Sequence, residues 1–158
     1  MAGVGADADV PRLPGVKILV VEARFYAQIN DLLVGGAQAV LRTSGAEVVH
    51  AVVPGALEIP AAIAMAQATG QFDGYVALGC VIRGETTHYE LVSGESCRGL
   101  MDLSVRERLA IGNGILTVEN EVQALERADP SRQDKGGGAA AAALALVAWR
   151  RRLAENAL

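Results

Sequence analysis

"GYVALGCVI", residues 74–82, is a short apolar run that changes without a break into the polar segment "RGETTHYE", residues 83–90. An apolar run of this length, bounded by a glycine and by polar residues, predicts a strand that is buried on both faces, as in parallel sheets. The change at residue 83 predicts that the strand leaves the core there. The polar segment is therefore expected to reach the surface at one end of a sheet.

Apolar runs of the same kind occur at three other places, and helical spacing follows each of the four. The other strands are predicted over residues 16–23, 46–53 and 108–118. Apolar residues that recur every three or four positions predict helices over residues 26–43, 59–69, 90–106, 121–128 and 136–155. Because such alternation favours right-handed crossovers onto one sheet, we predict a single three-layer α/β/α domain around a four-stranded parallel sheet.

Single residues predict where helices begin and end. Gly45 and Gly70 follow two helical stretches, where a left-handed residue often closes a helix, and Pro60 falls in a first turn, where proline is tolerated. Trp149 is expected to anchor the last helix through its large apolar area. Residues 1–15 are small, acidic or proline-containing without periodicity, which predicts a flexible N-terminal arm before a domain over residues 16–158.

The composition of the 158 residues excludes several classes of protein. The length fits one domain, and the net charge of −4 argues against a nucleic-acid partner. The chain has neither the roughly 18 consecutive apolar residues that span a bilayer nor a secretory start, so we expect no membrane partner and a cytoplasmic location. Cys80 and Cys97 lack C-x-x-C spacing, so no disulfide framework or metal site is predicted and both are expected to be reduced and buried.

Polar or unusual residues follow every predicted strand. The four segments are "ARFY" (23–26), "PGALE" (54–58), "RGETTH" (83–88) and "TVEN" (117–120). Ligands of open α/β sheets bind outside the carboxyl ends of the strands. We therefore expect the four segments to meet at that edge of the sheet, called the rim below, and to form a binding site.

The segment "RGETTH" has two interpretations. Gly84 permits a tight turn, and backbone N–H groups with the hydroxyls of Thr86 and Thr87 could hold an anion ahead of a helix. The other interpretation is a threonine cap of that helix. His88 could transfer protons near neutral pH, or it could be an ordinary packed or solvated side chain.

The remaining candidates also have two interpretations each. Glu58 could hold hydroxyl groups of a ligand or complement a helix dipole. Phe25 could stack on a flat ring, although an aromatic at a strand end is more often part of the core. Arg127 and Lys135 could clamp a phosphate, or they could be solvated charges beside a polar loop.

Five segments, taken together in their order along the chain, resemble those of a known protein family. They are "ARFY", "VPGALEIP", "ALGCVIRGETTHYELVSGES", "GILTVENEVQALERA" and "KGG". In this order and at these separations they strongly resemble the lumazine synthase family, over about residues 16–155. The resemblance implies a flavodoxin-like fold, no metal and no organic cofactor. It also implies a condensation of two small molecules, 5-amino-6-(D-ribitylamino)uracil and 3,4-dihydroxy-2-butanone 4-phosphate, to 6,7-dimethyl-8-ribityllumazine, phosphate and water.

The resemblance also implies which residues bind the substrates. They are Phe25, Ala56, Leu57, Glu58, Cys80, Val81, Ile82, Glu85, Thr86, Asn113, Arg127 and Lys135. Phe25 matches the residue that stacks on the pyrimidine, residues 56–58 match the segment that holds the ribityl chain, and the backbone of residues 80–82 matches the strand end that reads the pyrimidine edge. Asn113 stands where the family often has an aromatic residue from the neighbouring subunit, so an amide hydrogen bond would replace stacking.

The phosphate side of the site follows from the same resemblance. Glu85 and Thr86 match the pair that contacts the phosphate-bearing substrate. Arg127 matches the principal phosphate clamp, donated from the next subunit and assisted by Lys135. His88 matches the catalytic residue that transfers protons.

The family resemblance predicts a homopentamer with active sites between neighbouring subunits. Residues 128–134, "ADPSRQD", lack the glycine-rich loop associated with larger shells of the family, so a free pentamer is expected. A functional link to riboflavin synthase is also expected. The alternatives are a carrier of ribityllumazine or riboflavin, which would not need the phosphate clamp, and a signalling receiver domain, which would need an aspartate cluster that the strand ends lack.

Overall fold

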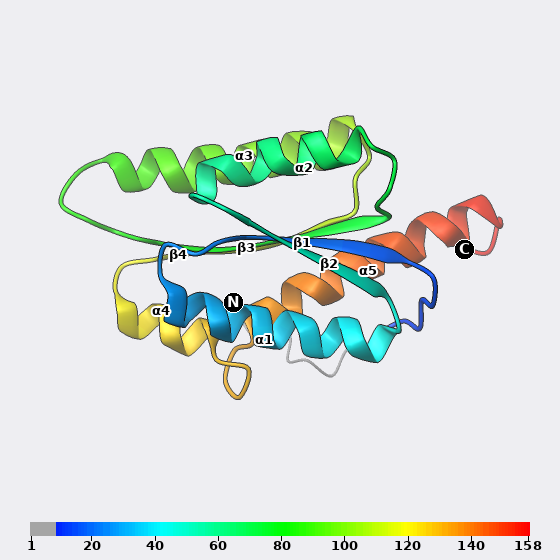
Figure 1. The fold of residues 1–158 in the computed structure, drawn as a ribbon, viewed down its shortest axis with the longest axis horizontal. Coiled ribbons are helices and arrows are strands. Elements are labelled where there is room, and N and C mark those ends of the chain that lie inside the picture. The colour runs from blue at the N-terminus through cyan, green and yellow to red at the C-terminus, as the bar shows by residue number, and fades with distance from the viewer. Residues whose placement is uncertain (1–8) are drawn as a thin grey trace.

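The computed structural model describes residues 9–158, and the order of the elements is the predicted one (Figure 1). Its strands and helices are β1 (Lys17–Ala23), α1 (Ala27–Ser44), β2 (Glu47–Val53), the short 3-10 helix η1 (Ala56–Glu58), α2 (Ile59–Gln67), β3 (Gly74–Ile82), α3 (His88–Arg106), β4 (Ile111–Val118), α4 (Glu121–Ala128) and α5 (Lys135–Ala154). The four strands form one parallel sheet in the order β2-β1-β3-β4. The predicted four-stranded parallel sheet is confirmed.

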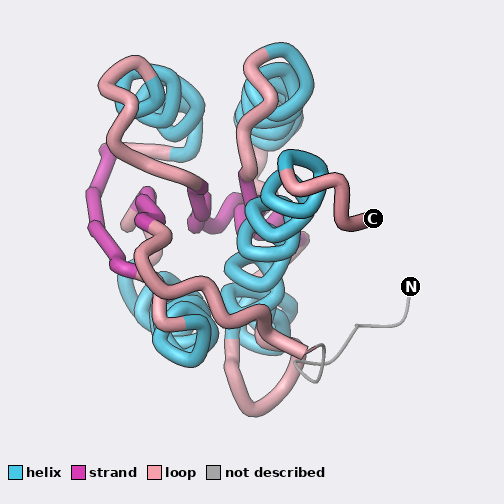
Figure 2. The backbone as a smooth tube through the Cα atoms, turned by 90° about the vertical axis from the view of Figure 1, so that its right-hand side faces the viewer, coloured by secondary structure: helices cyan, strands magenta, loops and turns pink. Residues whose placement is uncertain are grey.

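Helices cover both faces of the sheet. In Figure 1, α2 and α3 lie above the sheet, while α1, α4 and α5 lie below it. Figure 2 shows the same three layers from the side, with the strands between two groups of helices. The predicted three-layer α/β/α architecture is therefore confirmed. Within the described part of the chain, no helix combines the length and the apolar character needed to cross a bilayer.

The hydrophobic core is divided by the sheet into two clusters. On β1, Ile18 and Val20 belong to the cluster under α1 and α5, whereas Leu19 and Val21 belong to the cluster under α2. This division follows from the alternation of side chains along a strand. β3 is buried from its first residue to Val81, as its continuous apolar sequence predicted.

Most predicted boundaries lie within two residues of the observed ones: α2, for example, ends at Gln67 with Ala68 as its C-cap, and Gly70 follows two residues later. Two other differences have local reasons. β4 begins at Ile111 rather than at residue 108, because Arg108 adopts a positive φ of 55°, which interrupts an extended backbone. α3 begins at His88, two residues before the predicted start. The apolar spacing did not reveal these residues because the first turn of the helix is polar. The predicted end of α1 is confirmed, with Gly45 in the left-handed region at φ 77°.

The N-terminal part of α5 packs closely against the backbone of α1 and β4. A Cβ atom on Gly136 would overlap the carbonyl group of Leu33 in α1, and a Cβ atom on Gly112 in β4 would overlap the carbonyl group of Ala139. Only glycine allows backbones to approach this closely. The "KGG" segment therefore has a packing role that its position in the sequence did not reveal.

Three expectations about burial need correction. Trp149 does not anchor α5 within this chain, since 47% of its surface is exposed; small residues such as Ala140 and Ala143 hold the helix instead. Cys97 is exposed, whereas Cys80 is buried as expected. Leu13, in the predicted arm, is buried in the core and its N–H donates to the Ser44 carbonyl at 2.8 Å. The first eight residues of that arm lie outside the described residues.

Candidate functional site

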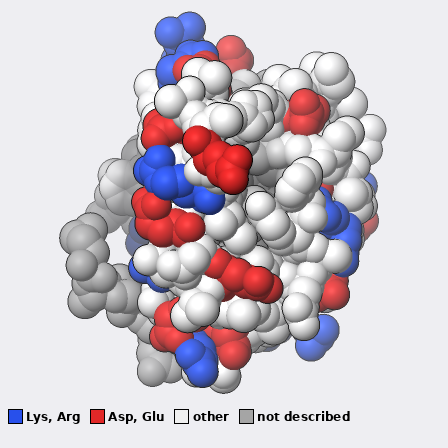
Figure 3. All heavy atoms as spheres, turned by 90° about the vertical axis from the view of Figure 1, so that its left-hand side faces the viewer, with Lys and Arg blue, Asp and Glu red and all other residues white. Residues whose placement is uncertain are grey.

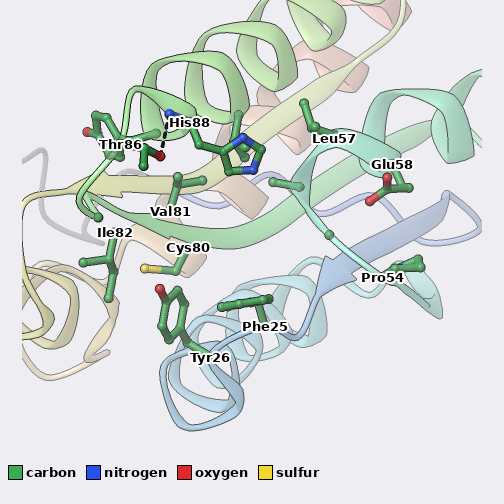
Figure 4. Close-up of a pocket in the computed structure, with 15 residues that line it drawn as sticks. Phe25, Tyr26, Pro54, Leu57, Glu58, Cys80, Val81, Ile82, Thr86 and His88 are labelled. Atoms are coloured by element: carbon green, nitrogen blue, oxygen red, sulfur yellow. Dashed lines mark hydrogen bonds between the residues drawn. The ribbon is translucent and has the colours of Figure 1, made fainter.

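A cavity of about 460 Å³ lies at the rim. Its walls come from the segments that follow β1, β2 and β3 and from the beginning of α3 (Figure 4). From β1 the chain runs to β2 on one side of the sheet, and β3 lies on the other side. Such a reversal of strand order is the usual position of a ligand site in an open α/β sheet. The fourth expected segment, after β4, does not line the cavity.

Nine of the predicted site residues line this cavity. They are Phe25, Ala56, Leu57, Glu58, Cys80, Val81, Ile82, Thr86 and His88. They come from three separate segments that are brought together by the parallel pairing of the strands that precede them. Glu85 belongs to the same loop as Thr86, but its side chain is exposed and does not line the cavity.

Three predicted site residues lie elsewhere in the chain. Asn113, on β4, accepts a hydrogen bond from the Ile115 N–H at 3.0 Å. Arg127, on α4, donates from Nη1 to the Gln123 carbonyl at 3.1 Å, and Lys135 begins α5. One copy of the chain does not bring these three residues to the cavity.

Six further cavity residues were not among the individually predicted site residues, although four of them stand in the segments that were expected to form the site. They are Tyr26, Pro54, Gly55, Gly84, Tyr89 and Val92. Five of them are immediate neighbours of predicted residues or stand in the same short loop. Val92 lies four positions after His88 on α3, so helical periodicity would have placed it on the same face.

Phe25 is an exposed aromatic ring at the cavity. Its surface is 76% exposed, so the interpretation as a core residue is wrong. Its neighbour Tyr26 meets it edge to face, with ring centroids 5.0 Å apart. One face of the Phe25 ring is thus available to a flat ligand, and stacking would bury apolar area that water now covers.

The backbone that carries Phe25 is held by charged neighbours. Arg24 donates to the buried carboxylate of Glu22 at 3.0 Å and to Asp31 at 2.7 Å. The contact with Asp31 ties the end of β1 to the N-terminal part of α1, and both contacts raise the pKa of Arg24, mainly through the hydrogen bond to Asp31. Arg24 thereby restrains the backbone directly before Phe25.

Cys80 is a neutral thiol in the cavity wall. Burial raises its pKa to about 12. Since the thiolate is the nucleophilic form, Cys80 is protonated at neutral pH and is not equipped for covalent catalysis. It offers a packed side chain and backbone groups.

The loop before α3 presents unpaired hydrogen-bond donors. Within residues 9–158, no N–H group of residues 84–87 donates to another group of the chain. The loop is exposed and leads into the N-terminus of α3, whose dipole attracts negative charge. A loop of free N–H groups at a helix N-terminus is suited to bind an anionic oxygen.

The two threonines of the loop differ in their hydrogen bonds. Thr86 Oγ1 accepts the His88 N–H at 3.3 Å, so this hydroxyl acts as a local cap (Figure 4). Thr87, which stands at the N-cap position, makes no side-chain cap hydrogen bond. The remaining donors of the loop are left for a ligand.

Glu58 and His88 add ionisable groups to the cavity. Glu58 is exposed and makes no cap hydrogen bond to α2, which it precedes. The exposed His88 is the first residue of α3, and its ring and that of Phe25 lie on different sides of the cavity (Figure 4). The cavity thus combines an aromatic face, a carboxylate, an imidazole and a loop of free N–H donors.

The chain is similar in sequence to proteins of one known family. The family model for 6,7-dimethyl-8-ribityllumazine synthase matches residues 15–151. The 6,7-dimethyl-8-ribityllumazine synthase of Novosphingobium aromaticivorans is 63% identical over 136 residues, which make up 86% of this chain and 97% of that protein. Those of Bartonella tribocorum and Methylobacterium radiotolerans are 59% identical over 140 residues (88% of this chain, 93% of the relative) and 58% identical over 141 residues (89% and 86%).

The match spans every residue that lines the cavity. The resemblance deduced from the five sequence segments is thereby confirmed. The chain therefore belongs to the 6,7-dimethyl-8-ribityllumazine synthase family.

Proposed function

We propose that the cavity at the rim is where this chain carries out the reaction of its family. The chain is a transferase of riboflavin biosynthesis that joins 5-amino-6-(D-ribitylamino)uracil to 3,4-dihydroxy-2-butanone 4-phosphate, with release of phosphate and water. The product is 6,7-dimethyl-8-ribityllumazine. The observation that carries the assignment to this cavity is the loop of free N–H donors opposite an exposed aromatic ring.

The uracil substrate fits the apolar and carboxylate part of the cavity. We assign the flat pyrimidine to the exposed face of Phe25 and its polar edge to the backbone of residues 80–82. The polyol chain then extends along Ala56 and Leu57 toward Glu58, whose carboxylate accepts hydrogen bonds from hydroxyl groups. This half of the proposal is supported by the cavity lining alone.

The phosphate-bearing substrate fits the loop before α3. We assign its phosphate to the free N–H groups of residues 84–87, with Glu85 and Thr86 in contact with the substrate. Arg127 and Lys135 complete the clamp from a neighbouring subunit, and Asn113 likewise approaches the pyrimidine from there. Guanidinium and ammonium groups are the cations that bind phosphate most often in proteins.

His88 is assigned the proton transfers of the reaction. Formation of an imine, loss of phosphate and closure of the second ring each move protons between nitrogen, carbon and oxygen. An imidazole exchanges protons near neutral pH, and His88 follows the anion-binding loop directly. Orientation of the two substrates supplies much of the remaining acceleration, up to about 7 to 11 kcal/mol in favourable cases.

Exposed apolar side chains support the proposed homopentamer. Five apolar side chains are 38–70% exposed in the single chain: Val48 and Val52 on the edge strand β2, and Leu91, Met101 and Val105 on α3. Apolar surface of this kind marks association sites. A ring of subunits with the same head-to-tail contact would bring Asn113, Arg127 and Lys135 of one copy to the cavity of the next.

Incubation with both substrates tests the proposed function. We expect lumazine fluorescence to appear together with one phosphate per product, and light scattering to give the mass of a pentamer. The product is then available to riboflavin synthase, so addition of that enzyme should yield riboflavin. Tight binding of ribityllumazine without phosphate release would instead identify a carrier and refute the proposal.

A further inference from the structure

Arg83 is a charged residue of the rim to which the proposed site gives no role. It follows β3, it does not line the cavity, and its backbone N–H donates to the Val118 carbonyl at 2.9 Å. This bond extends the pairing of β3 with β4 by one residue. Arg83 therefore stands at the last point where the loop of residues 84–87 is attached to the sheet.

The side chain of Arg83 reaches two elements that flank the loop. Its Nη1 donates to Glu90 in the first turn of α3 at 2.6 Å, and its Nε donates to Glu119 after β4 at 2.7 Å. The guanidinium also lies over the ring of Tyr89, 4.3 Å from the centroid. The hydrogen bond from Arg83 is the largest cause that lowers the pKa of Glu90.

The partner Glu119 stands on a fixed turn. Its backbone N–H donates to Gln123 Oε1 at 2.8 Å, and the side chain of Asn120 caps α4 by accepting the Gln123 N–H at 3.0 Å. Arg83 thus links the loop to the start of a capped helix. On the face of the molecule shown in Figure 3, which is the left-hand side of Figure 1, acidic and basic side chains are interspersed.

The loop has few other restraints. A Cβ atom on Gly84 would meet nothing within 4 Å, so no neighbouring group presses on the turn. Apart from the Thr86 to His88 contact, hydrogen bonds within residues 9–158 hold the loop only at its ends, through Arg83 and Glu90. The hydrogen bond from the Arg83 guanidinium to Glu90 joins those two ends directly.

We propose that Arg83 is a positioning residue that holds the loop of residues 84–87 and the start of α3 in the geometry needed for phosphate binding and for proton transfer by His88. The inference rests on the proposed function of the site. Two separate donors of one planar group reach two carboxylates, while its face covers Tyr89. The geometry of the guanidinium, and not its charge alone, supplies this restraint.

Two variants of Arg83 and one matched control test the proposal. Arg83→Gln removes the charge and the planar donor group, whereas Arg83→Lys keeps the charge but places it on a single nitrogen, without the separated, coplanar donors of the guanidinium. The control is Arg98→Gln on α3, because Arg98 also pairs with two carboxylates, those of Glu95 at 2.6 Å and Asp102 at 2.9 Å. We expect both Arg83 variants to lower kcat by roughly 10- to 100-fold, since small misplacements of reacting groups cost this much. The control is expected to keep the wild-type kcat.

Hydrogen exchange gives a readout that does not require activity. Peptides with the bonded amides of Arg83 and Glu90 should exchange faster in both Arg83 variants than in wild type, and not in the control. A wild-type protein that forms no lumazine would refute the proposed function, while the exchange comparison would still decide the role of Arg83. Wild-type kcat in Arg83→Lys, or unchanged exchange in both Arg83 variants, would overturn the positioning role.

Discussion

His88 is the residue on which the proposed chemistry depends most. It begins α3, directly after the loop with free N–H donors, and it is exposed to the cavity. The only other histidine, His50, lies on β2 and contacts the buried Glu22 carboxylate at 3.1 Å. His88 therefore has the proposed catalytic role, whereas His50 has a structural one.

Replacement of His88 should slow the reaction without abolishing it. We expect His88→Ala to lower the single-turnover rate by roughly 10- to 100-fold, because acid–base help is lost while orientation of the substrates remains. Rapid mixing with both substrates measures this rate. His50→Gln, which keeps an N–H donor toward Glu22, serves as the control. An unchanged rate in His88→Ala would show that another group transfers the protons.

Cys80 should resist alkylation in the folded protein. Burial raises its pKa to about 12, so almost no thiolate is present near pH 8. Iodoacetamide followed by mass spectrometry should label Cys80 slowly in the native protein and rapidly after unfolding in urea. The raised pKa also means that the folded state keeps a proton that the unfolded chain loses, so the contribution of Cys80 to stability declines as the pH rises from about 9 toward 12. Rapid labelling of the native thiol would contradict its burial.

At the scale of elements, the sequence predicted the strands better than the burial of the helices. β3 was recognisable because both of its faces are apolar, and the polar segments after β1, β2 and β3 correctly indicated the rim. The exposure of Trp149 was not predictable from spacing, since α5 is rich in alanine around its whole circumference. The start of β4 was missed because nothing in the local composition marks the left-handed Arg108.

The glycines of α5 provide a test of close helix packing. Gly136→Ala should lower the free energy of unfolding by about 1 to 3 kcal/mol, because the new Cβ would overlap the Leu33 backbone and force α5 away from α1. Gly138→Ala is the control, since its Cβ would meet nothing within 4 Å. It should stabilise the helix by roughly 0.5 to 1 kcal/mol. Urea unfolding measures both, and equal effects of the two substitutions would refute the packing role.

At the scale of the whole molecule, one chain supplies part of the proposed site. Nine predicted residues line the cavity, while Asn113, Arg127 and Lys135 do not. The sequence shows that Asn113, Arg127 and Lys135 stand at positions that match the family. Their distance from the cavity of a neighbouring copy depends on how the copies associate. This part of the site could be predicted only from the resemblance and stays a prediction.

Mixed subunits would test whether sites are shared. His88→Ala and Arg127→Ala proteins should each have low activity alone. When unfolded together and refolded as mixed rings, roughly a quarter of the sites should join an intact His88 from one subunit to an intact Arg127 from its neighbour, if the contact is head-to-tail. We therefore expect activity to return to about that fraction of wild type. No gain on mixing would mean that the two residues serve the same chain or do not share a site.

The exposed indole at the end of α5 gives the chain a built-in optical probe. Trp149 is the only tryptophan of the sequence, and it lies on the C-terminal part of α5, away from the residues that line the cavity. Its emission therefore responds to whatever covers this part of α5. A blue shift on increasing protein concentration would register subunit contact there, whereas filling the cavity would leave the emission wavelength unchanged.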